Sequence, residues 1–175
     1  LTWGFLAGNE EKKQVQVYTR SDSCGAAETW AKYLGGEQED LKGVSVYGDP
    51  GLAQAVRSDP LGLGFNNLNF AFDAATNRPV EGLAVVPLDA DGNGQADPAE
   101  QLDTKAKAIE AIAAGVYPSP PARDLYLVAR GGVTGLAREF VRWALTDGLQ
   151  YVEGTGYIRL SESQIRQALR QVDAR

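Results

Sequence analysis

Histidine is absent from this sequence of 175 residues. Because a Ser-His-Asp triad, a Cys-His pair and a histidine-ligated zinc site all need an imidazole, none of them can form within this chain. Cysteine is almost absent as well, and the single residue, Cys24, cannot form a disulfide within the chain. The sequence therefore lacks the side chains of the commonest hydrolytic sites, and we expect a protein that is not an enzyme.

Long apolar runs and an excess of basic residues are missing too. No run approaches the roughly 18 consecutive apolar residues of a membrane-spanning helix, so we expect no membrane span. The 17 Lys and Arg are outnumbered by 23 Asp and Glu, which gives a net charge of -6 and argues against nucleic acid as a partner. Methionine is absent even from position 1, and we expect a sequence that begins after processing or is an excerpt of a longer one.

The residues that are present indicate alternating strands and helices. Short apolar or alternating runs predict strands at residues 14–18, 44–47, 61–65, 83–88 and 124–129. Helical spacing of apolar side chains predicts helices at residues 26–34, 49–56, 104–114, 136–144 and 161–172. Ser161 and Gln164 resemble a capping box at the start of the last helix. This order of elements predicts an α/β fold with a mainly parallel sheet flanked by helices.

One segment, residues 20–26 (RSDSCGA), joins the first predicted strand to the first predicted helix. The first residues of a helix present backbone N–H groups without an intrahelical partner, and the helix dipole adds positive charge there. Arg20 can add a bidentate fork for two oxygens, and Gly25 lets the backbone approach a ligand closely. The segment is therefore suited to hold an anion.

Two other interpretations of this segment stay open. In the first, Ser21, Asp22 or Ser23 only caps the helix, and Arg20 pairs with a nearby carboxylate. In the second, Cys24 is a catalytic nucleophile, because a helix N-terminus favours its thiolate, although the histidine that usually assists such a group is missing. A cysteine can also replace serine here as a small polar residue.

The same segment resembles the R-x-x-x-S-G-T segment of phosphate-binding proteins, the extracytoplasmic solute receptors of phosphate ABC transporters. By this match Arg20 corresponds to the arginine, Cys24 to the serine, Gly25 to the glycine and Ala26 to the threonine. Further segments resemble the family in the same order, and they are Thr2-Trp3-Gly4 with Ala7-Gly8, Leu61 to Phe65, Arg123 to Val128, Phe140 to Trp143 and Gly156 to Leu160. The similarity touches most of the chain.

The resemblance implies a three-layer lobe of the periplasmic-binding-protein type over residues 1–175, with C-terminal return helices at about 146–175. It implies the second lobe of such a protein, with the first lobe absent from this chain and acting as a partner. The implied function is to bind phosphate or a similar oxyanion as the solute-binding component of an ABC transporter, whose permease is another partner. Such a protein is exported, periplasmic or extracellular, and can be membrane-anchored through a segment that precedes this sequence.

The anion-binding residues that we derive from this segment are Arg20, Ser23, Cys24, Gly25 and Ala26. Cys24 and Ala26 replace both hydroxyl side chains of the family's segment. Backbone N–H groups and Arg20 remain as donors, together with a thiol that donates more weakly than a hydroxyl. We therefore expect an affinity or an anion preference that differs from that of a standard phosphate receptor.

A second motif, residues 89–100 (DADGNGQADPAE), fits the twelve-residue calcium-loop pattern D-x-D-x-N-G-x-x-D-x-x-E. The predicted Ca²⁺ ligands are Asp89, Asp91, Asn93, the carbonyl of Gln95, Asp97 and a bidentate Glu100, with Gly94 at the sharp turn. Because the loop is unpaired and follows a predicted strand, we expect a structural clip rather than a calcium sensor. Calcium-rich extracellular space would suit such a clip.

The plainer interpretation of residues 89–100 is an acidic, glycine-rich turn in solvent. A further alternative concerns the whole chain, which would be a calcium-stabilised extracellular interaction domain without anion binding. In that case Arg20→Ala would change stability alone.

Overall fold

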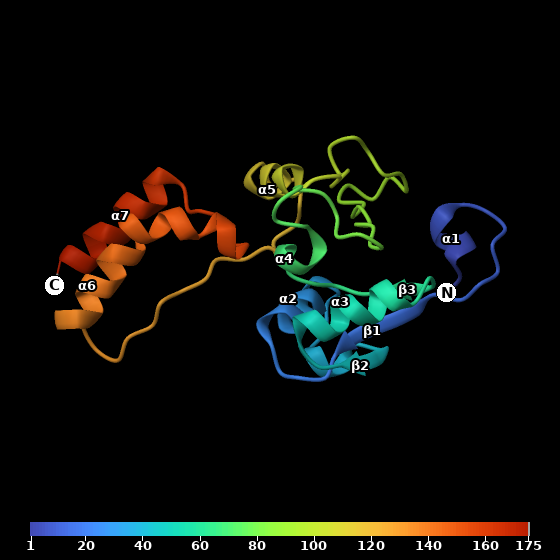
Figure 1. The fold of residues 1–175 in the computed structure, drawn as a ribbon, viewed down its shortest axis with the longest axis horizontal. Coiled ribbons are helices and arrows are strands. Elements are labelled where there is room, and N and C mark those ends of the chain that lie inside the picture. Colours follow the sequence, from blue (N-terminus) through green and yellow to red (C-terminus); the bar gives the residue numbers. More distant parts are fainter. Residues whose placement is uncertain (175) are drawn as a thin grey trace. The chain divides into compact units, whose positions relative to one another are not determined.

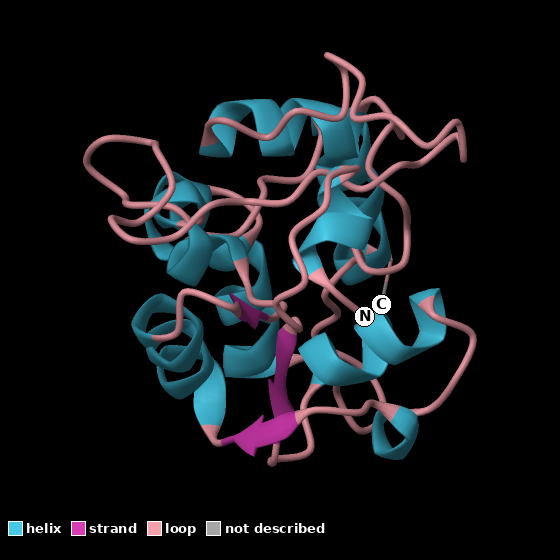
Figure 2. Cartoon of the chain, turned by 90° about the vertical axis from the view of Figure 1, so that its right-hand side faces the viewer, coloured by secondary structure: helices cyan, strands magenta, loops and turns pink. Residues whose placement is uncertain are grey.

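The computed structural model describes residues 1–174 (Figure 1). The chain forms two compact units, Leu1–Arg123 and Asp124–Arg175. Loops make up much of the chain, and its strands are short beside its helices (Figure 2). The first unit holds a parallel sheet with flanking helices, which confirms the α/β class that the sequence predicts.

Three short parallel strands form this sheet. They are β1 (Gln16–Arg20), β2 (Val44–Val46) and β3 (Gly62–Leu63), in the order β2-β1-β3. Tyr18 of β1 lies opposite Val44, and Gln16 lies opposite Gly62. Since the strands are parallel, their carboxyl ends share one edge of the sheet. The chain crosses from one side of β1 to the other between β2 and β3, so this edge is a topological switch point, where ligands bind in open α/β sheets.

A helix follows each strand of the first unit. This unit contains α1 (Trp3–Ala7), α2 (Gly25–Tyr33), the 3-10 helix η1 (Gln38–Asp40), α3 (Gly48–Ser58), α4 (Leu68–Ala71) and α5 (Lys105–Ala113). Because α2, α3 and α4 come after β1, β2 and β3, their N-termini follow the carboxyl edge of the sheet. The helix α5 begins where the sequence predicts it, after Thr104, whose hydroxyl accepts a hydrogen bond from the Lys107 N–H at 3.2 Å.

Two groups of buried side chains hold the first unit together. At the sheet, α3 contacts all three strands and buries Leu52. Trp30 of α2 stacks on Phe65, just after β3, with ring centroids 6.0 Å apart. The second group joins α5 to the segment that includes α4, and its buried members are Phe72, Leu102, Ala108 and Ala111. This group fixes the chain on both sides of the acidic segment 89–100.

The prediction of strands at residues 83–88 and 124–129 is wrong, since both segments are loop, and the strand predicted at 61–65 is reduced to β3. Residues 125–128 are at least 59% exposed, and Val128 is 91% exposed. A strand needs a neighbour that exchanges backbone hydrogen bonds with it, and an apolar sequence pattern cannot supply that neighbour. Within residues 1–174 neither segment has one.

The second unit is helical. It contains α6 (Gly135–Ala144), the 3-10 helices η2 (Asp147–Tyr151) and η3 (Glu153–Thr155), and α7 (Glu162–Asp173). Arg142 of α6 forms an ion pair with Asp173, and this hydrogen bond lowers the pKa of Asp173. The capping box at the start of α7 is confirmed, because Ser161 and Gln164 each accept the backbone N–H of the other.

The boundary between the units lies at Asp124. The prediction that residues 1–175 form one lobe with return helices from about 146 stays a prediction. None of the described helices has the length and apolar character needed to cross a membrane.

Candidate functional site

The predicted anion-binding residues run from the last residue of β1 through the following loop to the first residues of α2. β1 ends at Arg20, and α2 begins at Gly25. The residue that caps α2 is Cys24, whose Sγ accepts a hydrogen bond from the Ala27 N–H at 3.4 Å. Cys24 thus takes the place that the capping interpretation gave to Ser21, Asp22 or Ser23, as a serine would.

Two backbone N–H groups at the start of α2 are available to a ligand. The N–H of Cys24 donates to Oε1 of Gln38 at 3.2 Å, and the N–H of Ala27 donates to Cys24. No acceptor for the N–H groups of Gly25 and Ala26 occurs among residues 1–174. Both groups sit at the positive end of the helix dipole, so this is where an anion would be stabilised.

Arg20 comes shortly before these groups in the sequence, but its guanidinium is bound to two carboxylates. Its side chain is only 6% exposed. It donates to both carboxylate oxygens of Asp22, at 2.9 and 2.5 Å, and a third N–H donates to Asp49. A guanidinium has five N–H donors, so two of them remain for another acceptor. The pairing with a nearby carboxylate, one of the interpretations of the sequence, is therefore present in the structure.

Asp22 and Asp49 connect three loops at the carboxyl edge of the sheet. Asp22 also accepts the N–H of Gly48, at the start of α3, at 3.0 Å. The hydrogen bonds from Arg20 and then from Gly48 hold the pKa of Asp22 far below its usual value. Asn67, which precedes α4, donates to the carboxylate of Asp49 at 2.7 Å. The loops after β1, β2 and β3 are thereby fixed to one another around Arg20.

Sequence reasoning missed the residues that fix this loop from a distance. Gln38 of η1 accepts from the Cys24 N–H and donates to the carbonyl of Asp22 at 2.9 Å. Asn66 donates to the backbone carbonyl of Asp49 at 2.8 Å, so it connects the segment after β3 to the first turn of α3. The Arg-x-Asp spacing could have indicated Asp22. For Gln38 and Asp49 the sequence carries no local signal.

The acidic segment 89–100 brings three of its predicted metal ligands together. Oxygen atoms of Asp89, Asp91 and Glu100 lie within 4.8 Å of one another. Glu100 is buried, 7% exposed, and its two oxygens accept the N–H groups of Ala90 at 2.6 Å and Asp97 at 3.0 Å. The N–H of Gly94, followed by those of Gly92 and Asn93, lowers the pKa of Asp89. The loop therefore already gathers negative oxygens around one point.

The remaining predicted ligands belong to the same hydrogen-bonded loop. Nδ2 of Asn93 donates to Asp97 at 2.7 Å and to Asp91 at 3.2 Å, and its Oδ1 accepts the N–H of Gln95 at 2.7 Å. Asp97 and Asn93 thus bond to each other in the same loop as the three carboxylates. Calcium takes six to eight oxygens at about 2.3–2.6 Å, so binding would require these groups to turn toward the ion.

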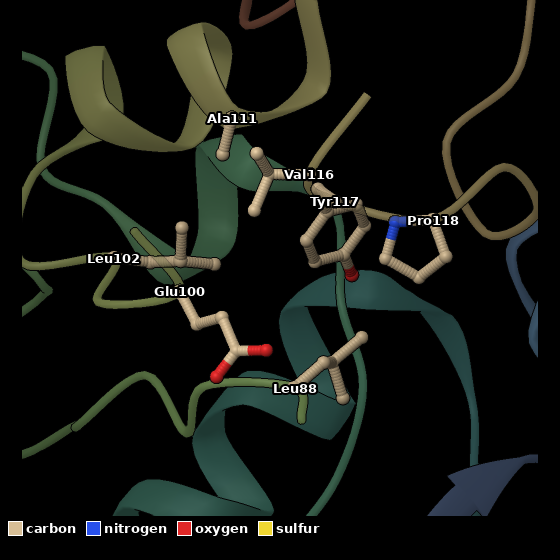
Figure 3. A pocket seen from close by; sticks show the side chains of 7 residues that line it. All are labelled: Leu88, Glu100, Leu102, Ala111, Val116, Tyr117 and Pro118. Carbon is tan, nitrogen blue, oxygen red and sulfur yellow. The ribbon is translucent and has the colours of Figure 1, made fainter. Parts of the chain in front are cut away.

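A small pocket lies behind the acidic segment. Its lining residues are Leu88, Glu100, Leu102, Ala111, Val116, Tyr117 and Pro118 (Figure 3). The Glu100 carboxylate and the Tyr117 ring face the same hollow in Figure 3, and burial raises the pKa of Tyr117. The hollow has room for about one water molecule, so it is too small for an organic ligand.

Comparison with known proteins identifies the family at the level of a superfamily. A family model described as a PBP superfamily domain matches residues 6–148, which include the sheet, the loop before α2 and the acidic segment. No curated protein and no solved structure matches the chain significantly. The matched residues cover well over half of the chain, and the parallel sheet with its flanking helices agrees with the match. The chain therefore belongs to the periplasmic-binding-protein (PBP) superfamily.

Proposed function

We propose that this chain binds phosphate or a similar oxyanion at the start of α2, as the solute-binding component of an ABC transporter. One observation carries the proposal. The N–H groups of Gly25 and Ala26 have no acceptor within residues 1–174, and they begin the helix that follows β1, at the carboxyl edge of a parallel sheet in a PBP superfamily chain. Membership of the superfamily supports solute binding, and the N–H groups support an anionic solute.

Arg20 would contribute to this site while remaining paired. Asp22 and Asp49 use three of its donors, and in this proposal the two remaining N–H groups donate to a ligand oxygen. The carboxylates hold the guanidinium in one orientation, which lowers the entropy lost when the anion binds. The roles of Ser23 and Cys24 are smaller in this proposal. Ser23 is exposed, and the Cys24 sulfur already accepts the N–H of Ala27.

The proposal includes partners that complete the site. We expect the other donors to come from the first lobe of the binding protein, and a hinge closure around the anion to be sensed by the permease. A protein with this task works outside the cytoplasm, in the periplasm or the extracellular space. It needs no chemistry, and the absence of histidine from the sequence agrees with a protein that is not an enzyme.

Amide NMR of the chain during titration with phosphate, and then with sulfate, tests anion binding. Saturable shifts at Gly25 and Ala26 are expected. The start of α5 is an internal control, because it is also a helix of nine residues but its Lys105 N–H already donates to the Asn77 carbonyl at 2.9 Å. Absence of saturable shifts at α2, or equal shifts at α5, would contradict the proposal and favour an interaction domain without anion binding.

We also propose that segment 89–100 binds Ca²⁺ as a structural ion. The observation that favours it is the gathering of Asp89, Asp91 and Glu100 within 4.8 Å, in the spacing of a calcium loop. Glu100 links the ion to the buried group that includes Leu102, so calcium would stabilise the packing of α5. Calorimetric titration with CaCl₂, with MgCl₂ as the competitor of the same charge, tests this. Equal binding of both ions, or of neither, would contradict it.

A further inference from the structure

A second arginine lies against the start of α2, and it comes from the far end of the first unit. The guanidinium of Arg123 is placed directly over Gly25. A Cβ added at Gly25 would collide with Nη2 of Arg123 and would lie 2.9 Å from its Cζ. The backbone of Gly25 is helical, so the residue is not needed there for a left-handed conformation. The absence of a side chain at position 25 is what lets Arg123 lie this close.

The charge of Arg123 is available, whereas that of Arg20 is not. Arg20 has two carboxylate partners, Asp22 and Asp49, so the cluster around it carries one net negative charge. Such a cluster by itself would repel an anion. Across residues 1–174, no carboxylate lies within ion-pair distance of Arg123. Arg123 therefore cancels the net negative charge of this cluster and supplies a cation without a carboxylate partner at this helix start.

The field of Arg123 reaches the first turn of α2. The pKa of Glu28, in that turn, is lowered chiefly by the hydrogen bond from Lys32 and further by the charge of Arg123. The side chain of Arg123 is exposed, so solvent screens part of this effect. It is also free to adjust its fork to a ligand, because no hydrogen bond within the described part of the chain restrains it.

We infer that Arg123 is the positively charged residue that contacts the ligand at this anion site. We also infer that residue 25 is a glycine because a side chain there would displace the Arg123 guanidinium. The inference rests on the proposed function and deepens it. The N–H groups of Gly25 and Ala26 bind one side of the oxyanion, and the planar fork of Arg123 binds two of its oxygens from the side where a Cβ would otherwise stand. Arg20 then contributes its two remaining N–H donors but no unbalanced charge, because Asp22 and Asp49 are its ion-pair partners.

The test is a double-mutant cycle on phosphate affinity, measured by NMR titration of the full chain. Arg123→Gln is expected to weaken phosphate binding about tenfold or more, because it removes a charge-assisted fork. Gly25→Ala keeps both charges but displaces the guanidinium, and we expect a smaller loss than in Arg123→Gln, because the flexible side chain still carries its charge near the site. If the methyl group acts by displacing Arg123, the double variant binds phosphate no more weakly than the single variant with the lower phosphate affinity.

Arg57→Gln is the matched control, since it removes the same charge from an exposed arginine at the other end of α3. Arg57 lies eight residues after Asp49, about 12 Å along the helix, so its loss should change phosphate affinity less than about twofold. Circular dichroism of each variant confirms that it is folded.

The outcomes separate the two proposals. If the parent chain binds neither phosphate nor sulfate, anion binding is wrong and the role of Arg123 falls with it. If the parent chain binds phosphate and Arg123→Gln binds it equally well, or if Arg57→Gln weakens binding as much as Arg123→Gln does, only the role of Arg123 is overturned. If the loss of phosphate-binding free energy in the double variant equals the sum of the two single losses, the explanation that Gly25 leaves room for the Arg123 guanidinium is overturned.

Discussion

At the scale of the residue, the hydroxyl groups missing from the start of α2 can be restored. Ala26 is the second residue of the helix and is partly exposed. A threonine there can donate its hydroxyl to a bound oxyanion, so we expect Ala26→Thr to tighten phosphate binding about tenfold, the size of one hydrogen bond to a charged acceptor. Ala106→Thr, at the same position of α5, is the control for helix propensity. An unchanged affinity in Ala26→Thr would place the anion elsewhere.

The carboxylate of Asp22 gives a second test at this scale, on stability. The pKa of Asp22 is lower in the folded chain than in the unfolded chain, where it is about 4. Its carboxylate therefore stabilises the folded state at a pH above about 4, and this stabilisation is lost as the pH falls toward the folded pKa. Asp22→Asn should therefore lower the urea midpoint clearly at pH 7, and the gap to the parent chain should narrow below pH 4.

Asp103→Asn is the comparison for this test, because Asp103 is 63% exposed and forms a surface pair with Lys107. Such pairs contribute little, so its urea midpoint should hardly change at either pH. A gap for Asp22→Asn that is the same at pH 7 and pH 3 would mean that the ion pair with Arg20 does not stabilise the fold.

The candidate site could be predicted from the sequence where its parts are neighbours in the chain. Arg20, Cys24, Gly25 and Ala26 lie at a strand end and a helix start, as their spacing indicates. The groups that decide the charge of the site come from elsewhere, since Asp49 lies 29 residues after Arg20. Arg123 joins Gly25 only when the first unit is folded. The spacing of apolar residues along the sequence does not predict contacts between residues that are this far apart in the chain.

At the scale of the element, capping decides where the helices begin. Ser161 accepts the N–H of Gln164 at 3.3 Å, and Gln164 accepts the N–H of Ser161 at 3.0 Å. Ser161→Ala should cost about 1 kcal/mol of stability in α7. Hydrogen exchange at the first turn of α7 measures it, with Gln167→Ala, an exposed change in the middle of the same helix, as control. Equal protection in the two variants would contradict a capping role.

The predicted helices have counterparts in the structure, but two predicted strands do not. A helix satisfies its backbone groups within one segment, so a local pattern with a cap such as Thr104 is enough to predict α5. A strand depends on a neighbour, and residues 124–129 have the apolar composition of a strand without that neighbour. Composition alone cannot tell whether a partner strand is present.

At the scale of the whole molecule, the two units should respond differently to calcium. The acidic segment and the buried group behind it belong to Leu1–Arg123. An ion that binds only the folded state stabilises it by about 2.7 kcal/mol at a concentration of 100 times its dissociation constant. We therefore expect calcium to slow hydrogen exchange in α5 and to leave α7, in the other unit, unchanged.

Two variants connect this response to the loop. Glu100→Gln keeps the shape of the buried side chain but removes its charge, so it should abolish the protection of α5 by calcium. Asp103→Asn removes a carboxylate three residues beyond the loop and should leave the protection intact. If both variants respond as the parent chain does, calcium acts through the general acidity of the chain rather than through residues 89–100. If calcium protects α7 from hydrogen exchange as much as it protects α5, the ion stabilises both units. That result would contradict the hypothesis that calcium is a structural clip of the first unit alone.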